Sequence, residues 1–228
     1  MGAGVSTSAR PGLTPLAWAV KGGHEAVVKM LLERNDVDPN IADTFGETPL
    51  LIACRGRYEG VLKLLLERKD VNPNIVDRHG ETPLLIASRG QYEGVLKVLL
   101  GRDDVNPNIA DTFGQTPLII AIHGGYEGVL ELLLERNDVG LNIADRLGQT
   151  PLGIAACKGH EGVVKVLLER NEVNPNIGDW YNEKPLRKEP YEWLKRRNVN
   201  PNTPNRSIVT PLTVSASNGH VAVVKMLL

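Results

Sequence analysis

The sequence repeats itself at a fixed interval, and this repetition limits the folds that the chain can adopt. The tripeptide Thr-Pro-Leu recurs every 34 residues, and its copies begin at Thr14, Thr48, Thr82, Thr116 and Thr150. It returns in altered form at Lys184, again 34 residues on, and a final copy follows at Thr210 after only 26. A period of this size predicts a solenoid, in which each unit buries its apolar face only by stacking on its neighbours.

The composition agrees with this organisation. Of the 228 residues, 42% are hydrophobic but only 4% are aromatic, so the core must be built from Leu, Val, Ile and Ala. Lys and Arg number 26 against 27 Asp and Glu, which gives a formal net charge of −1. This balance argues against a binder of nucleic acids or anionic membranes, which would carry a basic excess. No apolar run approaches the roughly 18 residues of a membrane span.

Each repeat is predicted to begin with a short helix. Thr48 suits the N-cap position, and Pro49 suits the first turn because its missing N–H costs nothing there. The apolar run that follows ends near Gly56 and contains a small residue that suits close helix packing, repeated as Ala19, Ala53, Ala87, Ala121 and Ala155. Trp18 replaces an isoleucine of later repeats, so we expect it in the core.

A second helix and a projecting turn complete the predicted repeat. Glu59 opens an amphipathic helix with an inward face of Val61, Leu62, Leu65 and Leu66, and an outward face of Lys63, Glu67 and Arg68. Asn72-Pro73-Asn74 then stops the helix and forces extended chain. Residues 77–80 form a tight turn whose Gly80 supplies a positive φ. The predicted fold class is therefore all-α, with helix-turn-helix units joined by projecting β-hairpin loops.

This repeat resembles a known family. The pattern D-x-x-G-x-T-P-L-x-x-A, followed by G-H-E-x-V-V-K-x-L-L, is similar to the ankyrin repeat, and residues 23–25 and 159–161 match its second-helix start best. The longer spacer at residues 35–40 resembles the ankyrin arrays of filamentous fungi, which often follow a nucleotide-binding module in immune-like receptors. The resemblance implies an ankyrin-repeat solenoid of about six to seven repeats over residues 9–228, incomplete at both ends, behind a flexible tail at residues 1–8.

Departures from the family pattern predict local changes. The histidine that usually follows Thr-Pro-Leu and ties neighbouring hairpins together is replaced by Leu51, Leu85, Ile119 and Gly153. We therefore expect apolar contact to take the place of that polar tie. The repeat near residues 178–208 is too short for two helices and a turn, so we expect the array to bend and to open first there. Ile208 replaces the last turn glycine, and a β-branched residue is strained at positive φ.

The sequence carries no catalytic motif. His24-Glu25 opens like a zinc-protease motif, but Val28 stands where the second histidine should be, and there is no phosphate-binding loop. We therefore expect no enzyme activity, no cofactor and no metal. Cys54 and Cys157 lack Cys-x-x-Cys spacing, which indicates a reduced, intracellular protein, cytoplasmic or alternatively nuclear. Met1–Ser6 fits the N-myristoylation pattern, and an unstructured Gly/Ser start explains it equally well.

The resemblance also implies where a partner binds. Ankyrin proteins usually contact partners through hairpin tips and the exposed ends of the first helices, which together line a concave groove. Carried over by position, these candidate partner-binding residues are Phe45, Arg55, Arg78, His79, Arg89, Phe113, His123, Arg146, Trp180 and Tyr181. Aromatic residues and Arg are enriched in binding hot spots. The alternative is that each tip packs on the next hairpin, and for Trp180 and Tyr181 we favour packing inside the shortened repeat.

These observations predict a non-catalytic module that binds a protein partner, in particular an acidic and apolar segment, and that binds neither nucleic acid nor membranes stably. The alternative is a sensor or regulatory ankyrin segment of a longer nucleotide-binding immune-like receptor. The last repeat would leave an apolar face uncovered, consisting of Val223, Val224, Leu227 and Leu228. We therefore also expect self-association through the C-terminal repeat.

Overall fold

The computed structural model describes residues 13–175 and 209–228. The predicted tail, the shortened repeat near 178–208, Trp180, Tyr181 and Ile208 lie outside these residues. The chain divides into two compact units, Met1–Thr112 and Phe113–Leu228. The described residues of both units form helices and loops without a strand, which confirms the all-α prediction. None of these helices is long and apolar enough to cross a membrane.

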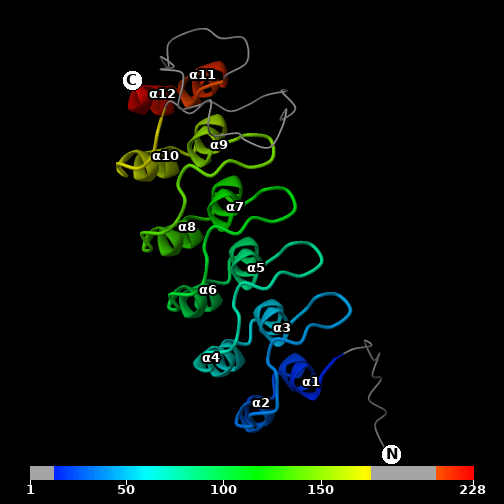
Figure 1. Ribbon diagram of the computed structural model, residues 1–228. Coiled ribbons are helices and arrows are strands. Elements are labelled where there is room, and N and C mark those ends of the chain that lie inside the picture. Colours follow the sequence, from blue (N-terminus) through cyan, green and yellow to red (C-terminus); the bar gives the residue numbers. More distant parts are fainter. Residues whose placement is uncertain (1–12, 176–208) are drawn as a thin grey trace, which may run out of the picture. The chain divides into compact units, whose positions relative to one another are not determined.

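Within residues 13–112, the first unit is built from helix pairs. In chain order its helices are α1 (Pro15–Lys21), α2 (Glu25–Leu32), α3 (Pro49–Gly56), α4 (Glu59–Glu67), α5 (Pro83–Gly90) and α6 (Glu93–Leu100). Helices α1, α3 and α5 pack side by side in one layer, and α2, α4 and α6 form the second layer (Figure 1). The long loops that precede α3 and α5 project beside the first layer (Figure 1).

The described part of the second unit repeats this arrangement. Its helices are α7 (Pro117–Gly124), α8 (Glu127–Leu134), α9 (Pro151–Lys158), α10 (Glu161–Leu168), α11 (Pro211–Ser217) and α12 (Val221–Leu227). Helix α9 packs against α7 and α11, and α10 packs against α12 (Figure 1). The final copy of the repeat at Thr210 is therefore a helix pair that packs on the pair before it.

The sequence signals at the helix starts act as predicted. The Thr48 hydroxyl oxygen accepts a hydrogen bond from the Leu51 N–H at 3.3 Å, with Pro49 in the first turn of α3. Every other first helix in the described residues begins with the same threonine cap and proline. Gly80 has a φ of 75°, the left-handed conformation that the tight turn requires. Helix start and turn position were thus readable from local residues.

The core of the first unit is built mainly from leucine, valine and alanine, and leucine supplies its largest fully buried side chains. The large side chains that are fully buried there are Leu16, Leu50, Leu51, Leu62, Leu65, Leu84, Leu85, Leu96 and Leu99. Ala53 and Ala87 are fully buried between adjacent first helices, as their size predicted. Each buried leucine contributes roughly 1.5–3 kcal/mol relative to exposure. The interfaces between repeats are therefore the main source of stability.

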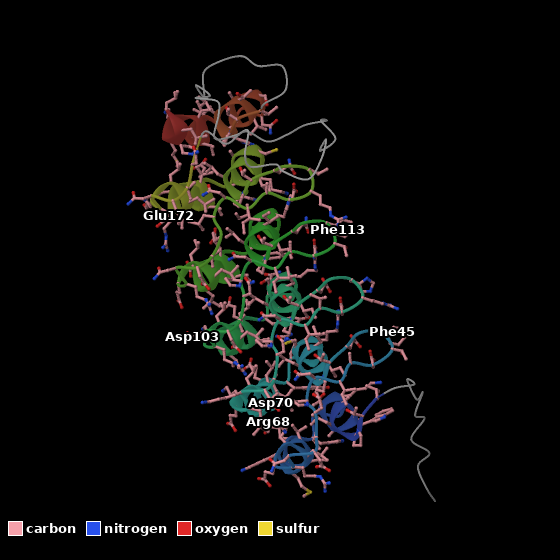
Figure 2. All side chains as sticks on the ribbon, in the orientation of Figure 1. Phe45, Arg68, Asp70, Asp103, Phe113 and Glu172 are labelled. Carbon is pink, nitrogen blue, oxygen red and sulfur yellow. The ribbon has the colours of Figure 1, made fainter. Side chains whose placement is uncertain are left out.

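Four predictions about burial were wrong. Trp18 is 37% exposed in the described part of the chain, where α1 packs on α2 and α3, and its ring centroid lies 5.2 Å from the Lys21 ammonium. Arg68, which Figure 2 labels, is only partly exposed, because its guanidinium donates to the Leu32 carbonyl at 3.2 Å. Leu66 is only half-buried, and Val223 is buried because α12 packs on α10.

Asparagine side chains join the spacers of neighbouring repeats. The Asn40 amide donates to the Asp70 carbonyl at 2.7 Å, and its oxygen accepts from the Asn72 N–H at 2.8 Å. Asn74 makes the same pair of bonds to Asp104 and Asn106, at 2.7 and 2.8 Å. In the second unit, the Asn142 amide donates to the Glu172 carbonyl at 2.6 Å. Each bonded backbone group lies 30 or 32 residues further along the chain.

We expect Asn74→Ala to destabilise the protein by about 1–2 kcal/mol, since a backbone carbonyl and an N–H in the next repeat both lose their partner. Urea unfolding followed by circular dichroism measures the change. Asn72→Ala is the matched control, because among the described residues the Asn72 side-chain oxygen accepts only from the nearby Asn74 N–H, at 2.9 Å. Equal losses for the two variants would contradict a role of Asn74 in joining repeats.

Candidate functional site

The hairpin loops are held in shape by a buried aspartate. One carboxylate oxygen of Asp77 accepts hydrogen bonds from the His79 N–H at 2.8 Å and the Glu81 N–H at 2.9 Å. Asp43 and Asp145 bind their own loops in the same way. Because the bond fixes the backbone on both sides of the turn, the two tip residues of each loop have a defined position.

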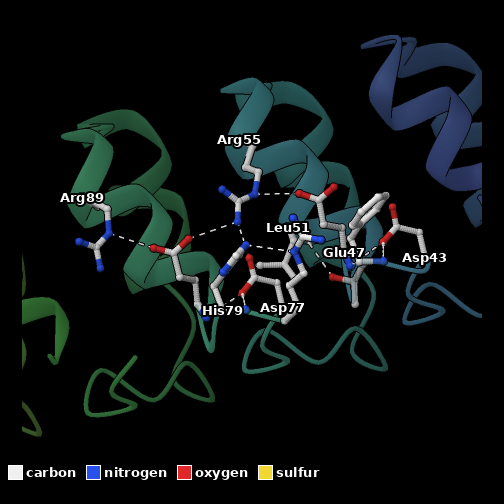
Figure 3. A network of polar contacts seen from close by, with 11 residues as sticks. Asp43, Glu47, Leu51, Arg55, Asp77, His79 and Arg89 are labelled. Atoms are coloured by element: carbon white, nitrogen blue, oxygen red, sulfur yellow. Dashed lines mark hydrogen bonds and ion pairs between the residues drawn. The ribbon is translucent and has the colours of Figure 1, made fainter. Parts of the chain in front are cut away.

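A chain of ion pairs connects consecutive hairpins of the first unit. Arg55, at the end of α3, pairs with the Glu47 carboxylate at 2.9 Å and with the Glu81 carboxylate at 3.2 Å, and it also pairs with Asp77 (Figure 3). Arg89, at the end of α5, repeats the arrangement with Glu81 at 2.9 Å and Asp111 at 2.7 Å. We call these two arginines and four carboxylates the arginine ladder.

The arginine ladder corrects one prediction from the sequence. Leu51 is buried, as apolar replacement of the family histidine required, but a polar tie between hairpins is still present. Arg55 supplies it from a position four residues later. Burial works against the charge of Arg55, but Asp77, Glu81 and Glu47 together raise its pKa above the ordinary value. Both predicted groove arginines, Arg55 and Arg89, are therefore already bound by carboxylates of their own chain.

The structure brings three predicted tip residues of the first unit together. The Arg78 guanidinium lies over the Phe45 ring, 4.7 Å from its centroid, and the Arg78 N–H donates to the Phe45 carbonyl at 3.2 Å. The Arg78 side chain also donates to the His79 ring at 3.1 Å. Phe45 is half-buried as a result, whereas Arg78 and His79 are exposed. The Phe45 ring thus packs on the next hairpin, and its contact with a partner stays a prediction.

The tips of the second unit are more apolar. Phe113 is 69% exposed and Leu147, one repeat later, is 67% exposed. The Arg146 N–H donates to the Phe113 carbonyl at 3.2 Å, so these two tips are adjacent, and the Arg146 side chain is exposed. Leu147 was absent from the predicted site. The available signal was its position, since it occupies the same turn position as Phe45 and Phe113.

His123 stands at the helix-end position that Arg55 and Arg89 occupy in the first unit. It is half-buried at the end of α7. Burial lowers the pKa of His123 most, electrostatic interactions with Lys158 and His160 lower it further, and Asp145 opposes them. The lowered pKa favours the neutral imidazole.

Comparison with known proteins identifies the family. A sequence model described as "Ankyrin repeats (3 copies)" matches residues 16–111 and 93–179, which together are more than half of the chain. The chain belongs to the ankyrin-repeat family. A search of curated proteins finds no match.

Solved ankyrin-repeat structures share the fold. The ankyrin repeat domain of Bcl-3, titled as a unique member of the IkappaB protein family, is 22% identical with a TM-score of 0.74, over 95% of this chain and 85% of that chain. The ankyrin-repeat protein EF0377 is 22% identical with a TM-score of 0.72, over 93% and 95%. A domain from Acinetobacter baumannii AYE is 21% identical with a TM-score of 0.73, over the same shares. Ankyrin repeats are protein–protein interaction modules and are generally non-catalytic.

The arginine ladder should contribute measurably to the stability of this ankyrin array. Glu81 binds both arginines, so we expect Glu81→Gln to lower the free energy of unfolding by about 1 kcal/mol, and by less in about 1 M salt. Glu67→Gln, at an exposed position of α4, serves as the control. Urea unfolding at low and high salt measures both variants, and an equal effect in both salts would argue against an ionic role.

His123 should make stability depend on pH. Its folded pKa is lowered from 6.5, so the unfolded chain binds the proton more tightly, and stability falls as pH drops through about 6.5. We expect His123→Gln to lose less stability than the wild type between about pH 8 and pH 6. The aspartates with lowered pKa values titrate below this window. Unfolding midpoints at several pH values measure the difference, and parallel curves would contradict the assignment.

Proposed function

We propose that the chain binds a protein partner through its hairpin tips, with Phe113 and Leu147 as the apolar anchors. One observation carries the proposal: two large apolar side chains on adjacent tips are each about two-thirds exposed. Exposed apolar groups that lie together mark interaction sites. The ankyrin fold adds weight, because this family consists of protein–protein interaction modules.

The loops hold these anchors in place before a partner arrives. Asp145 accepts from the Leu147 N–H at 2.8 Å and from the Gln149 N–H at 2.9 Å, which fixes the backbone of that tip. The bond from Arg146 to the Phe113 carbonyl fixes the two tips against each other. Because the anchors are already ordered, association costs less conformational entropy.

The other predicted residues take different roles in this proposal. Arg78, His79 and Arg146 are exposed on the tips and would contact the partner at the polar rim. The Phe45 ring packs against the Arg78 guanidinium and helps to fix its position. Arg55 and Arg89 act as positioning residues, because their guanidiniums hold neighbouring hairpins together. Trp180 and Tyr181 remain predictions.

The double variant Phe113→Ala/Leu147→Ala tests the proposal. We expect an unchanged melting temperature, since both side chains lie on hairpin tips, outside the stacked helices. Affinity for a partner isolated with the wild-type chain should fall by at least about 2 kcal/mol, or roughly 30-fold. Calorimetric titration measures the affinity. The control is Val221→Ala, which removes an equally exposed apolar side chain from α12.

Two outcomes would contradict the proposal. If the double variant keeps full affinity, the tips are not the binding site. If its melting temperature falls sharply, the two side chains are packing groups instead. The predicted role as a sensor segment of a longer nucleotide-binding receptor would use the same surface, and it stays a prediction, as does self-association through α12.

A further inference from the structure

The second layer of helices begins with α2 in the first unit and ends with α12 in the second. Within residues 13–112, α2 packs on α4, and no second-layer helix lies on its other side (Figure 1). In the described part of the second unit, α12 packs on α10 and likewise has a second-layer neighbour on one side. At these two helices the contact that joins consecutive repeats is therefore interrupted.

The open side of α2 is apolar. Val27 is 45% exposed, whereas the equivalent residues Val61 and Val95 are at most 1% exposed in helices that follow another second helix. This helical position therefore faces the preceding repeat. Met30, three residues later on the same side of α2, is 67% exposed. We call Val27 and Met30 the α2 face.

The open side of α12 is apolar as well. Val224 and Leu227 are half-buried, whereas the equivalent Leu62 and Leu65 of α4 are fully buried beneath the next repeat. These two helical positions therefore face the following repeat. Leu228, at the end of α12, is 89% exposed. We call Val224, Leu227 and Leu228 the α12 face.

The first residues of the second helices also match between the two ends. The Glu25 carboxylate of α2 occupies the space that a Cβ at Gly60 of α4 would fill, so the first residue of one helix lies over the second residue of the next. If α12 lay before α2 in the same way, Val221 would meet Ala26, and both are exposed. Valine brings no carboxylate into the space of the alanine Cβ. Ala222 of α12 shows that the packing of second helices accepts alanine at this position.

We infer that the α12 face of one copy of this chain binds the α2 face of a second copy, so that copies join head to tail. This contact repeats the packing of α2 on α4, which the chain already forms between its own repeats. Each face lacks the neighbour that the other supplies, and burial of their apolar side chains drives the association. The hairpin tips take no part, so the inference is independent of the proposed function.

A head-to-tail contact joins two different surfaces, and it can therefore continue beyond a dimer. Sedimentation velocity of the full chain at rising concentration should show a mass that grows past the dimer. Met30→Lys blocks the α2 face and Leu228→Lys blocks the α12 face, because each lysine would have to be buried without a partner. Both side chains are mostly exposed, so we expect unchanged melting temperatures.

Mixing the two variants gives the sharpest result. Each variant alone should stay monomeric at concentrations at which the wild type associates. An equimolar mixture should form a one-to-one dimer and no larger species, since one intact α12 face meets one intact α2 face. Val76→Lys is the matched control, because Val76 is 42% exposed and lies in neither face, and it should associate like the wild type.

Several results would overturn the inference. A wild type that stays monomeric, or a mixture that stays monomeric, would show that the two faces do not bind each other. If Met30→Lys alone still forms dimers, the α12 faces pair with each other instead. Association that appears only after removal of residues 1–12 would assign the α2 face of the full chain to its own N-terminal segment.

Discussion

The fold depends on the burial of leucine between consecutive helix pairs. A single pair of eight-residue helices leaves one face apolar, and only the next pair covers it. Leu62 and Leu65 are fully buried on α4, as are Leu96 and Leu99 on α6. Because this contact recurs at every step, the loops do not need to contribute to a core. They can project freely and carry exposed side chains such as Phe113 and Leu147.

The helical architecture could be read from the sequence because its signals are local. A threonine cap, a proline in the first turn and a turn glycine each act within a few residues, and the 34-residue period shows where each pattern starts again. The buried leucines follow helical spacing. Trp18 shows the limit of this reasoning, since its burial depends on what packs against α1 and not on its own position in the repeat.

The site was harder to predict because its contacts are distant in sequence. Arg55 reaches Asp77 and Glu81, which lie 22 and 26 residues further on. The residue type at position 55 suggested a surface free to bind acidic partners, whereas the geometry places it among its own carboxylates.

The asparagine bonds between spacers have a consequence for how such an array can change. The side chains of Asn40 and Asn74 each bond to backbone groups of the following repeat, namely one carbonyl and one N–H. Backbone groups are the same whatever side chains a repeat carries. These bonds therefore do not restrict the side chains of the following repeat, and they can be kept when repeats are duplicated or exchanged and the tips diverge. The asparagine bonds between spacers are thus independent of side-chain identity, whereas the hairpin loops differ from one repeat to the next.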